Sequence, residues 1–97
     1  MKEIDSQALE GIREAIFTAK SPHVSVIDKI MAQPPSYTPS YQIGSSIYPS
    51  FEINVSEKEG IEILDSLVEI EAKYGYSKIF KERQINLLIG EWRRAIS

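Results

Sequence analysis

The chain has 97 residues, 42% of them hydrophobic and 26% charged, and a formal net charge of −3, values typical of one globular domain, which we place at residues 1–97. It has no cysteine, which excludes disulfides, thiolate catalysis and cysteine-based metal sites. Residues 1–5 carry acids where a secretion signal carries bases, and the uncharged stretch 30–51 contains four prolines. We therefore expect a cytoplasmic protein that does not cross a membrane.

Two helices are expected in the first third of the chain. The first covers residues 6–19, with Asp5 as its N-cap and Phe17 widening its apolar stripe. Ser21-Pro22 marks the start of a second helix, because a hydroxyl cap followed by proline is a common beginning. This helix should end near Ala32, ahead of two consecutive prolines.

After the second helix, apolar and polar side chains alternate, which indicates β-strands. Gly44-Ser45 matches the glycine-first pattern of a type II′ turn and predicts a β-hairpin, in which pairing should end or bulge at Pro49. The predicted pairs are Ile43 with Ser46 and Tyr41 with Tyr48. An ordered proline-rich loop is the alternative interpretation.

Two longer helices are expected in the second half. Ser56 and Glu59 form a capping box for the first, which should end at Gly75. Its apolar residues make two stripes that we expect to be buried together: Ile61, Leu64 and Val68 beside Ile63, Leu67, Ile70 and Tyr74. Ser77 should cap the last helix, in which Gly90 indicates a close crossing with another backbone.

These elements predict a mostly α, α+β fold of four helices with one β-hairpin inserted between helices 2 and 3. Residues 57–73 hold six acids against two lysines, and residues 78–97 hold five bases against two acids. We therefore expect the last two helices to be antiparallel neighbours with complementary flanks, where an exposed ion pair contributes about 0–1 kcal/mol.

Three acids, Glu62, Asp65 and Glu69, lie along one side of the third helix and are called the acidic ridge. It is interpreted as a solvated face, as a surface for a basic protein, or as a site for a hard cation such as Mg²⁺. One straight row of three acids does not enclose an ion, so no metal site is predicted.

No catalytic residue is identified. His23 is the single histidine, and the sequence places no nucleophile or carboxylate beside it. A nucleophile elbow, a phosphate-binding loop and a dinucleotide fingerprint are all missing, so we expect no enzymatic activity and no cofactor. Glu82 and Glu91 interrupt the basic last helix, so nucleic-acid binding is not expected.

The remaining signal is the Tyr/Ser/Pro-rich stretch that contains Tyr37, Tyr41, Ile47 and Tyr48. Tyrosine offers contact area at low entropic cost beside adaptable hydroxyls, the mixture that binding loops favour. These side chains either cover the open end of the helical core or bind a partner. Tyr41 and Tyr48 share the face of Ile43 and fit the core interpretation better, whereas Tyr37 and Ile47 fit an exposed surface.

The segment Ile47-Tyr48-Pro49 is similar to the tyrosine- and proline-bearing loop of the small acidic immunity proteins of nuclease colicins. The similarity is limited to this segment, and the predicted hairpin departs from that family's all-helical pattern, so no residue role is transferred. The leading hypothesis is a small non-enzymatic protein-binding module, an immunity- or antitoxin-type inhibitor of a basic partner protein. An accessory subunit of a larger assembly, or a homodimer, is the alternative. A third hypothesis is an enzyme that works through Tyr and Glu side chains or through His23.

Overall fold

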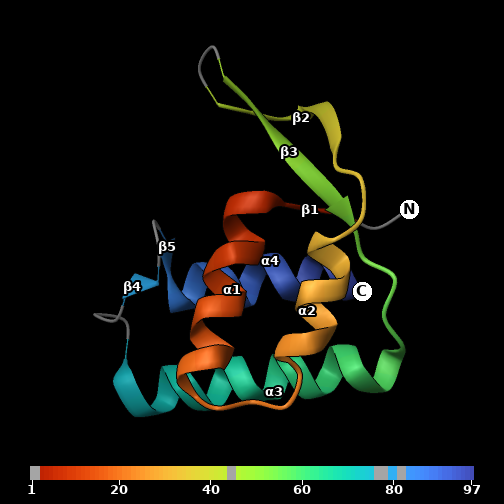
Figure 1. Cartoon of the computed structure of the whole chain (residues 1–97). Helices are drawn as coiled ribbons and strands as arrows, with labels where there is room; N and C mark the ends of the chain where they lie inside the picture. The colour runs from red at the N-terminus through yellow and green to blue at the C-terminus, as the bar shows by residue number, and fades with distance from the viewer. Residues whose placement is uncertain (1–2, 44–45, 76–78, 81–82) are drawn as a thin grey trace.

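The computed structural model describes residues 3–43, 46–75, 79–80 and 83–97, with side-chain surroundings for 3–36, 49–75 and 84–97. Its elements are β1 (Glu3–Asp5), α1 (Ser6–Thr18), α2 (Val24–Met31), β2 (Ser36–Ile43), β3 (Ser46–Glu52), α3 (Glu57–Tyr74), β4 (Ile79–Phe80), β5 (Arg83–Gln84) and α4 (Ile85–Ile96) (Figure 1). This order confirms the predicted fold class, because the described chain has four helices and the antiparallel β2–β3 hairpin lies between α2 and α3.

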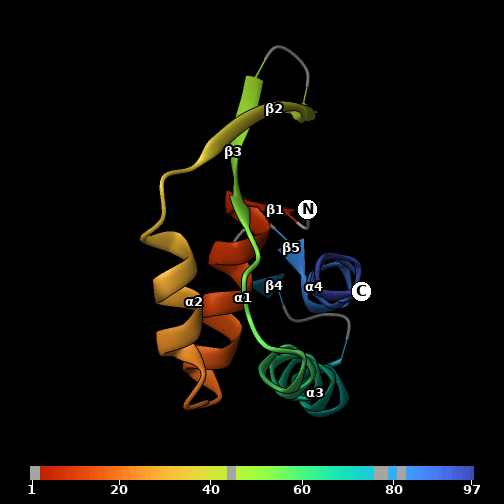
Figure 2. The same cartoon turned by 90° about the vertical axis from the view of Figure 1, so that its right-hand side faces the viewer.

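The helices form two crossing pairs. α1 and α2 run antiparallel to each other and lie across α3 and α4, which are also antiparallel neighbours (Figures 1 and 2). The hairpin extends from the end of this body that lies farthest from α3 (Figures 1 and 2). β1 joins it to make a three-stranded sheet of order β1-β3-β2.

The start of α1 follows the sequence prediction. The Ala8 amide donates a hydrogen bond of 2.9 Å to the Asp5 carboxylate, which is buried at the N-cap. Phe17 does not widen the buried stripe as predicted. Its side chain is 62% exposed and lies beside the guanidinium of Arg13. Arg13 also pairs with Asp28 of α2, which raises the pKa of the arginine.

α2 begins two residues later than the sequence indicated. The Ser21 hydroxyl accepts a hydrogen bond of 3.1 Å from the His23 amide, so it stabilises a turn, and the helix starts at Val24. The end of α2 at Met31, with Ala32 as C-cap, agrees with the prediction.

The α3–α4 crossing is close, but at a different glycine from the predicted one. Gly90 is exposed, and a Cβ added there would have no neighbour within 4 Å. The close approach is at Gly60, where an added Cβ would lie 3.3 Å from Cγ2 of Ile96. The indole of Trp92 reaches the same place and donates a hydrogen bond of 2.9 Å to the Gly60 carbonyl.

The capping box of α3 is confirmed, since the Glu59 amide donates to the Ser56 hydroxyl at 3.1 Å. Gly75 has φ +74° and ends the helix as predicted. The predicted start of α4 is wrong: it begins at Ile85, because residues 79–80 pair with 83–84 as the short β4–β5 strands. The predicted cap Ser77 lies outside the described residues.

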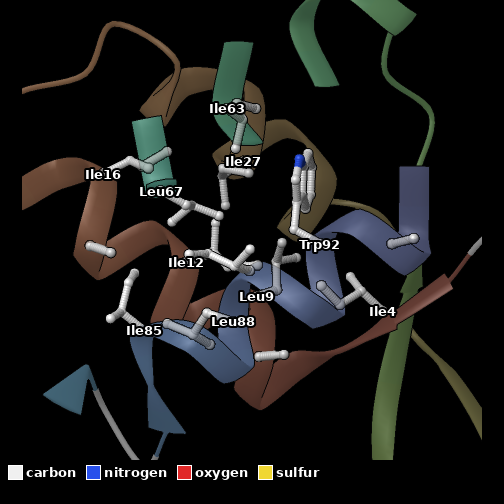
Figure 3. Close-up of a cluster of buried hydrophobic side chains, with 14 of the residues drawn as sticks. Ile4, Leu9, Ile12, Ile16, Ile27, Ile63, Leu67, Ile85, Leu88 and Trp92 are labelled. Atoms are coloured by element: carbon white, nitrogen blue, oxygen red, sulfur yellow. The ribbon is translucent and has the colours of Figure 1, made fainter. Parts of the chain in front are cut away.

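Only one of the two apolar stripes of α3 is buried. Ile63, Leu67 and Ile70 are inside the core, but Tyr74 at the end of the same stripe is 41% exposed, contrary to the prediction. In the other stripe, Ile61 and Val68 are exposed on the outer side, and Leu64 is partly buried against the core. The reason is topological: the described chain packs on one side of α3 only, where it meets α1 and α4. The core joins side chains from all four helices, many of them drawn in Figure 3, and from the strands β1 and β3.

The sequence predicted ion pairs between the acidic side of α3 and the basic side of α4. The ion pairs of the described residues include Arg13–Asp28, His23–Glu62 and Arg94–Glu91. None of these three joins α3 to α4, so the contact between these helices is seen here as one of apolar packing and the indole hydrogen bond.

Candidate functional site

The predicted partner-binding residues fall on two separate parts of the molecule. Tyr37 and Tyr41 are in β2, and Ile47 and Tyr48 are in β3, whereas the acidic ridge is on α3. The hairpin and α3 lie at opposite ends of a body whose longest extent is 35 Å (Figure 1). Charge interactions are screened over about 8 Å at physiological ionic strength. The two groups are therefore two separate surfaces.

The base of the hairpin is firmly attached to the helices. The hydroxyl of Ser50, which is fully buried, lies 3.0 Å from a carboxylate oxygen of Glu3 in β1 and 3.3 Å from the Ser36 carbonyl in β2. The side-chain amide of Gln33, just after α2, donates to the Glu52 carbonyl at 3.2 Å. Phe51 packs into the core. These contacts set the direction in which the hairpin leaves the body.

Beyond this base, the hairpin leaves the helical body. β1 pairs only with the last three residues of β3, Ser50–Glu52, and the sheet order makes β2 an edge strand. Both views show the strands continuing past the helices (Figures 1 and 2). The predicted turn, Gly44-Ser45, and the side chains of Tyr37, Tyr41, Ile47 and Tyr48 lie outside the described part of the structure.

The register of the hairpin agrees with the prediction near its turn and changes further on. Ile43 faces Ser46 as expected, but Pro49 faces Tyr37, so the register shifts between Tyr37 and Gln42. Tyr41 lies inside this irregular segment, and the predicted pairing with Tyr48 is not part of either regular ladder. The prediction of an end or bulge at Pro49 is therefore wrong in its position: Pro49 keeps a register partner, and the irregularity lies in β2 between Tyr37 and Gln42.

The acidic ridge borders a groove of about 680 Å³ between α3 and the turn that joins α1 to α2. Nε2 of His23 lies 3.2 Å from Oε2 of Glu62, and the imidazole is largely buried. Asp65 and Glu69 are exposed along the same wall. The sequence analysis placed no carboxylate beside His23, because that contact depends on how the α1–α2 turn folds over α3.

A histidine held by a carboxylate can act as a general base if a nucleophile faces its other ring nitrogen. Three hydroxyls of this groove have backbone partners: Thr18 donates to the Glu14 carbonyl, Ser66 donates to the Glu62 carbonyl, and Ser21 accepts from the His23 amide. No group of three or more histidine, aspartate or glutamate side chains within the described residues is arranged to hold a metal ion.

No protein family, curated protein or solved structure matches this chain. No helix within the described residues is long and apolar enough to cross a bilayer.

Proposed function

We propose that this chain is a small non-enzymatic protein-binding module, and that it inhibits its partner in the manner of an immunity protein or antitoxin. The observation that carries the proposal is the projection of the β2–β3 hairpin from the helical body (Figures 1 and 2). A hairpin that covered the core would lie over the helices. A two-stranded ribbon in water is marginally stable by itself, so its Tyr/Pro-rich strands are suited to burial against another molecule.

The charge of α3 supports a basic partner. Its residues 57–73 hold six acids against two lysines, a formal charge of −4, and Asp65 and Glu69 are exposed. An exposed field of one sign increases the rate of association with a partner of opposite charge. Because the ridge and the hairpin are at opposite ends, the partner contacts them at two separate places, or two partners do.

A tagged form of the chain, used to capture proteins from an extract of its native cells, tests the proposal. The pair Tyr37→Ala and Ile47→Ala should lose a stoichiometric protein partner without lowering the melting temperature. Leu87→Ala, which removes an exposed apolar side chain from α4, is the matched control and should retain the partner. Recovery of no stoichiometric partner, or unfolding of the hairpin variant, would contradict the proposal.

A homodimer or an accessory subunit is the second candidate, and one observation favours it. β2 is an edge strand, and neither β2 nor the part of β3 beyond β1 carries a charged residue that would oppose pairing with another strand. Sedimentation of the pure protein distinguishes the candidates, because a tight dimer would have twice the 11.0 kDa mass of the chain.

A further inference from the structure

The outer side of α3 carries a row of apolar residues that the described chain leaves partly uncovered. Ile61 and Val68 are 46% and 41% exposed, and Leu64 between them is partly buried. We call these three residues the outer stripe. Their spacing places them on one side of the helix. Single exposed apolar residues are ordinary, whereas a continuous row along a helix is typical of a contact surface.

Other exposed apolar side chains differ from the outer stripe. The ring of Phe17 has the Arg13 guanidinium 5.6 Å from its centroid, and Tyr74 has the Lys73 ammonium at 5.4 Å. These rings therefore have cationic neighbours within the chain. Leu87 is a single exposed leucine on α4. The outer stripe has aliphatic side chains only, and these are stabilised by apolar contact.

A hollow of about 580 Å³ adjoins the N-terminal end of the outer stripe and shares Ile61 with it. Its apolar walls come from the linker after β3 and from the end of α4, through Ile53, Val55 and Ile96. Glu57 and Arg93 are its charged lining residues. The hollow offers space for one large apolar side chain of a molecule that lies along α3.

The charges around the stripe indicate which molecule binds there. Glu57, Asp65 and Glu71 are each three or four residues from Ile61 or Val68, against one lysine, Lys58, at that spacing. In a second copy of the chain, the same face would bring one −4 segment against another. Like charges in contact oppose association, so a basic surface is favoured.

We infer that the outer stripe binds an amphipathic helix of the partner, with apolar residues facing the stripe and Lys or Arg on both flanks. This inference rests on the proposed function, since it specifies how the basic partner is recognised on α3. One apolar anchor of the partner helix enters the hollow beside Ile61, and its cations lie near Glu57, Asp65 and Glu71.

Fluorescence anisotropy with a labelled synthetic helix of about five turns tests the inference at physiological salt. The helix carries a leucine stripe flanked by lysines. Two matched peptides replace the lysines by glutamates or scramble the stripe. We expect saturable binding of the basic amphipathic peptide and little binding of the other two. Equal binding of all three peptides, or no binding of the basic one, would overturn the inference.

Variants of the whole chain locate the contact. Ile61→Ser with Val68→Ser should weaken peptide binding at least about 10-fold, which corresponds to about 1.4 kcal/mol. Leu87→Ser is the matched control on α4 and should change the affinity less than about 2-fold, which corresponds to about 0.4 kcal/mol. Asp65→Lys should also weaken binding, whereas Glu10→Lys, an exposed change on α1, should not. Thermal melting of every variant separates lost binding from lost folding.

The result can be separated from the test of the proposed function. A partner that is captured through the hairpin but is indifferent to Ile61 and Val68 would leave the proposed function standing and remove the α3 contact. A wild-type dimer that Val68→Ser dissociates would assign the outer stripe to a second copy and overturn the inference.

Discussion

At the α3–α4 crossing, the chain is held by packed side chains, whereas along the hairpin beyond Ser50 the structure describes backbone strand pairing. The crossing has a buried indole bonded to the Gly60 carbonyl, with Ile96 packed against the same glycine. The hairpin has strand pairing, and beyond Ser50 it rests on a single partner strand (Figure 1). A close-packed interior is rigid, whereas a two-stranded ribbon in water is only marginally stable. The crossing should therefore matter most to the stability of the fold, whereas the hairpin is the part that we propose for partner binding.

The largest effect should come from the crossing. Trp92→Ala removes a fully buried side chain and its hydrogen bond, and should lower the free energy of unfolding by about 3–5 kcal/mol. Urea denaturation followed by circular dichroism measures the change. Trp92→Phe keeps most of the packing and should lose less. A small loss for the alanine variant would mean that the crossing is not the main support of the fold.

A smaller effect is expected at the base of the hairpin. Ser50→Ala removes the hydroxyl that lies between Glu3 and Ser36, and should cost about 1–2 kcal/mol because one acceptor is a carboxylate. Ser66→Ala is the control, since its hydroxyl bonds to a carbonyl of its own helix and should matter little. In the Ser50→Ala variant, amide hydrogen exchange should speed up more in β2 and β3 than in α1. Equal acceleration in both would indicate that the base is no separate unit.

The smallest effects compare the two helical glycines. Gly90→Ala should raise the free energy of unfolding by up to about 1 kcal/mol, because the site is an open helix surface. Gly60→Ala gains the same helix propensity but requires Ile96 to move, so its stability should be lower than that of Gly90→Ala. Chemical denaturation of both variants measures this difference. Equal gains would show that the crossing is looser than the structure indicates.

The local signals of the sequence predicted most of the elements correctly. Asp5, the Ser56–Glu59 capping box and Gly75 act within one helical turn, so their neighbours are known from the sequence. The start of α4 was missed because Phe80, which fits a helical stripe, instead lies in a short strand. Tertiary contacts can override a local pattern of this length.

The candidate surfaces were harder to predict. The sequence identified the acidic ridge and the tyrosine-rich hairpin but could not place them at opposite ends of the molecule. It also missed the pairing of His23 with Glu62, which brings together residues that are far apart in the chain. An alternation of apolar and polar residues predicts a strand, but it does not say whether that strand covers the core or leaves it.

By itself, therefore, the sequence determined the helix caps and helix ends that depend on neighbouring residues, because caps and prolines act on the backbone next to them. It did not determine the starts of α2 and α4 or the strands β1, β4 and β5. The tertiary structure alone decided which stripe of α3 is buried, which glycine meets another helix and which surfaces remain open. The two stripes of α3 have the same chemistry, and only the positions of α1 and α4 distinguish them. Burial depends on what packs against a residue, and that is set by the whole chain.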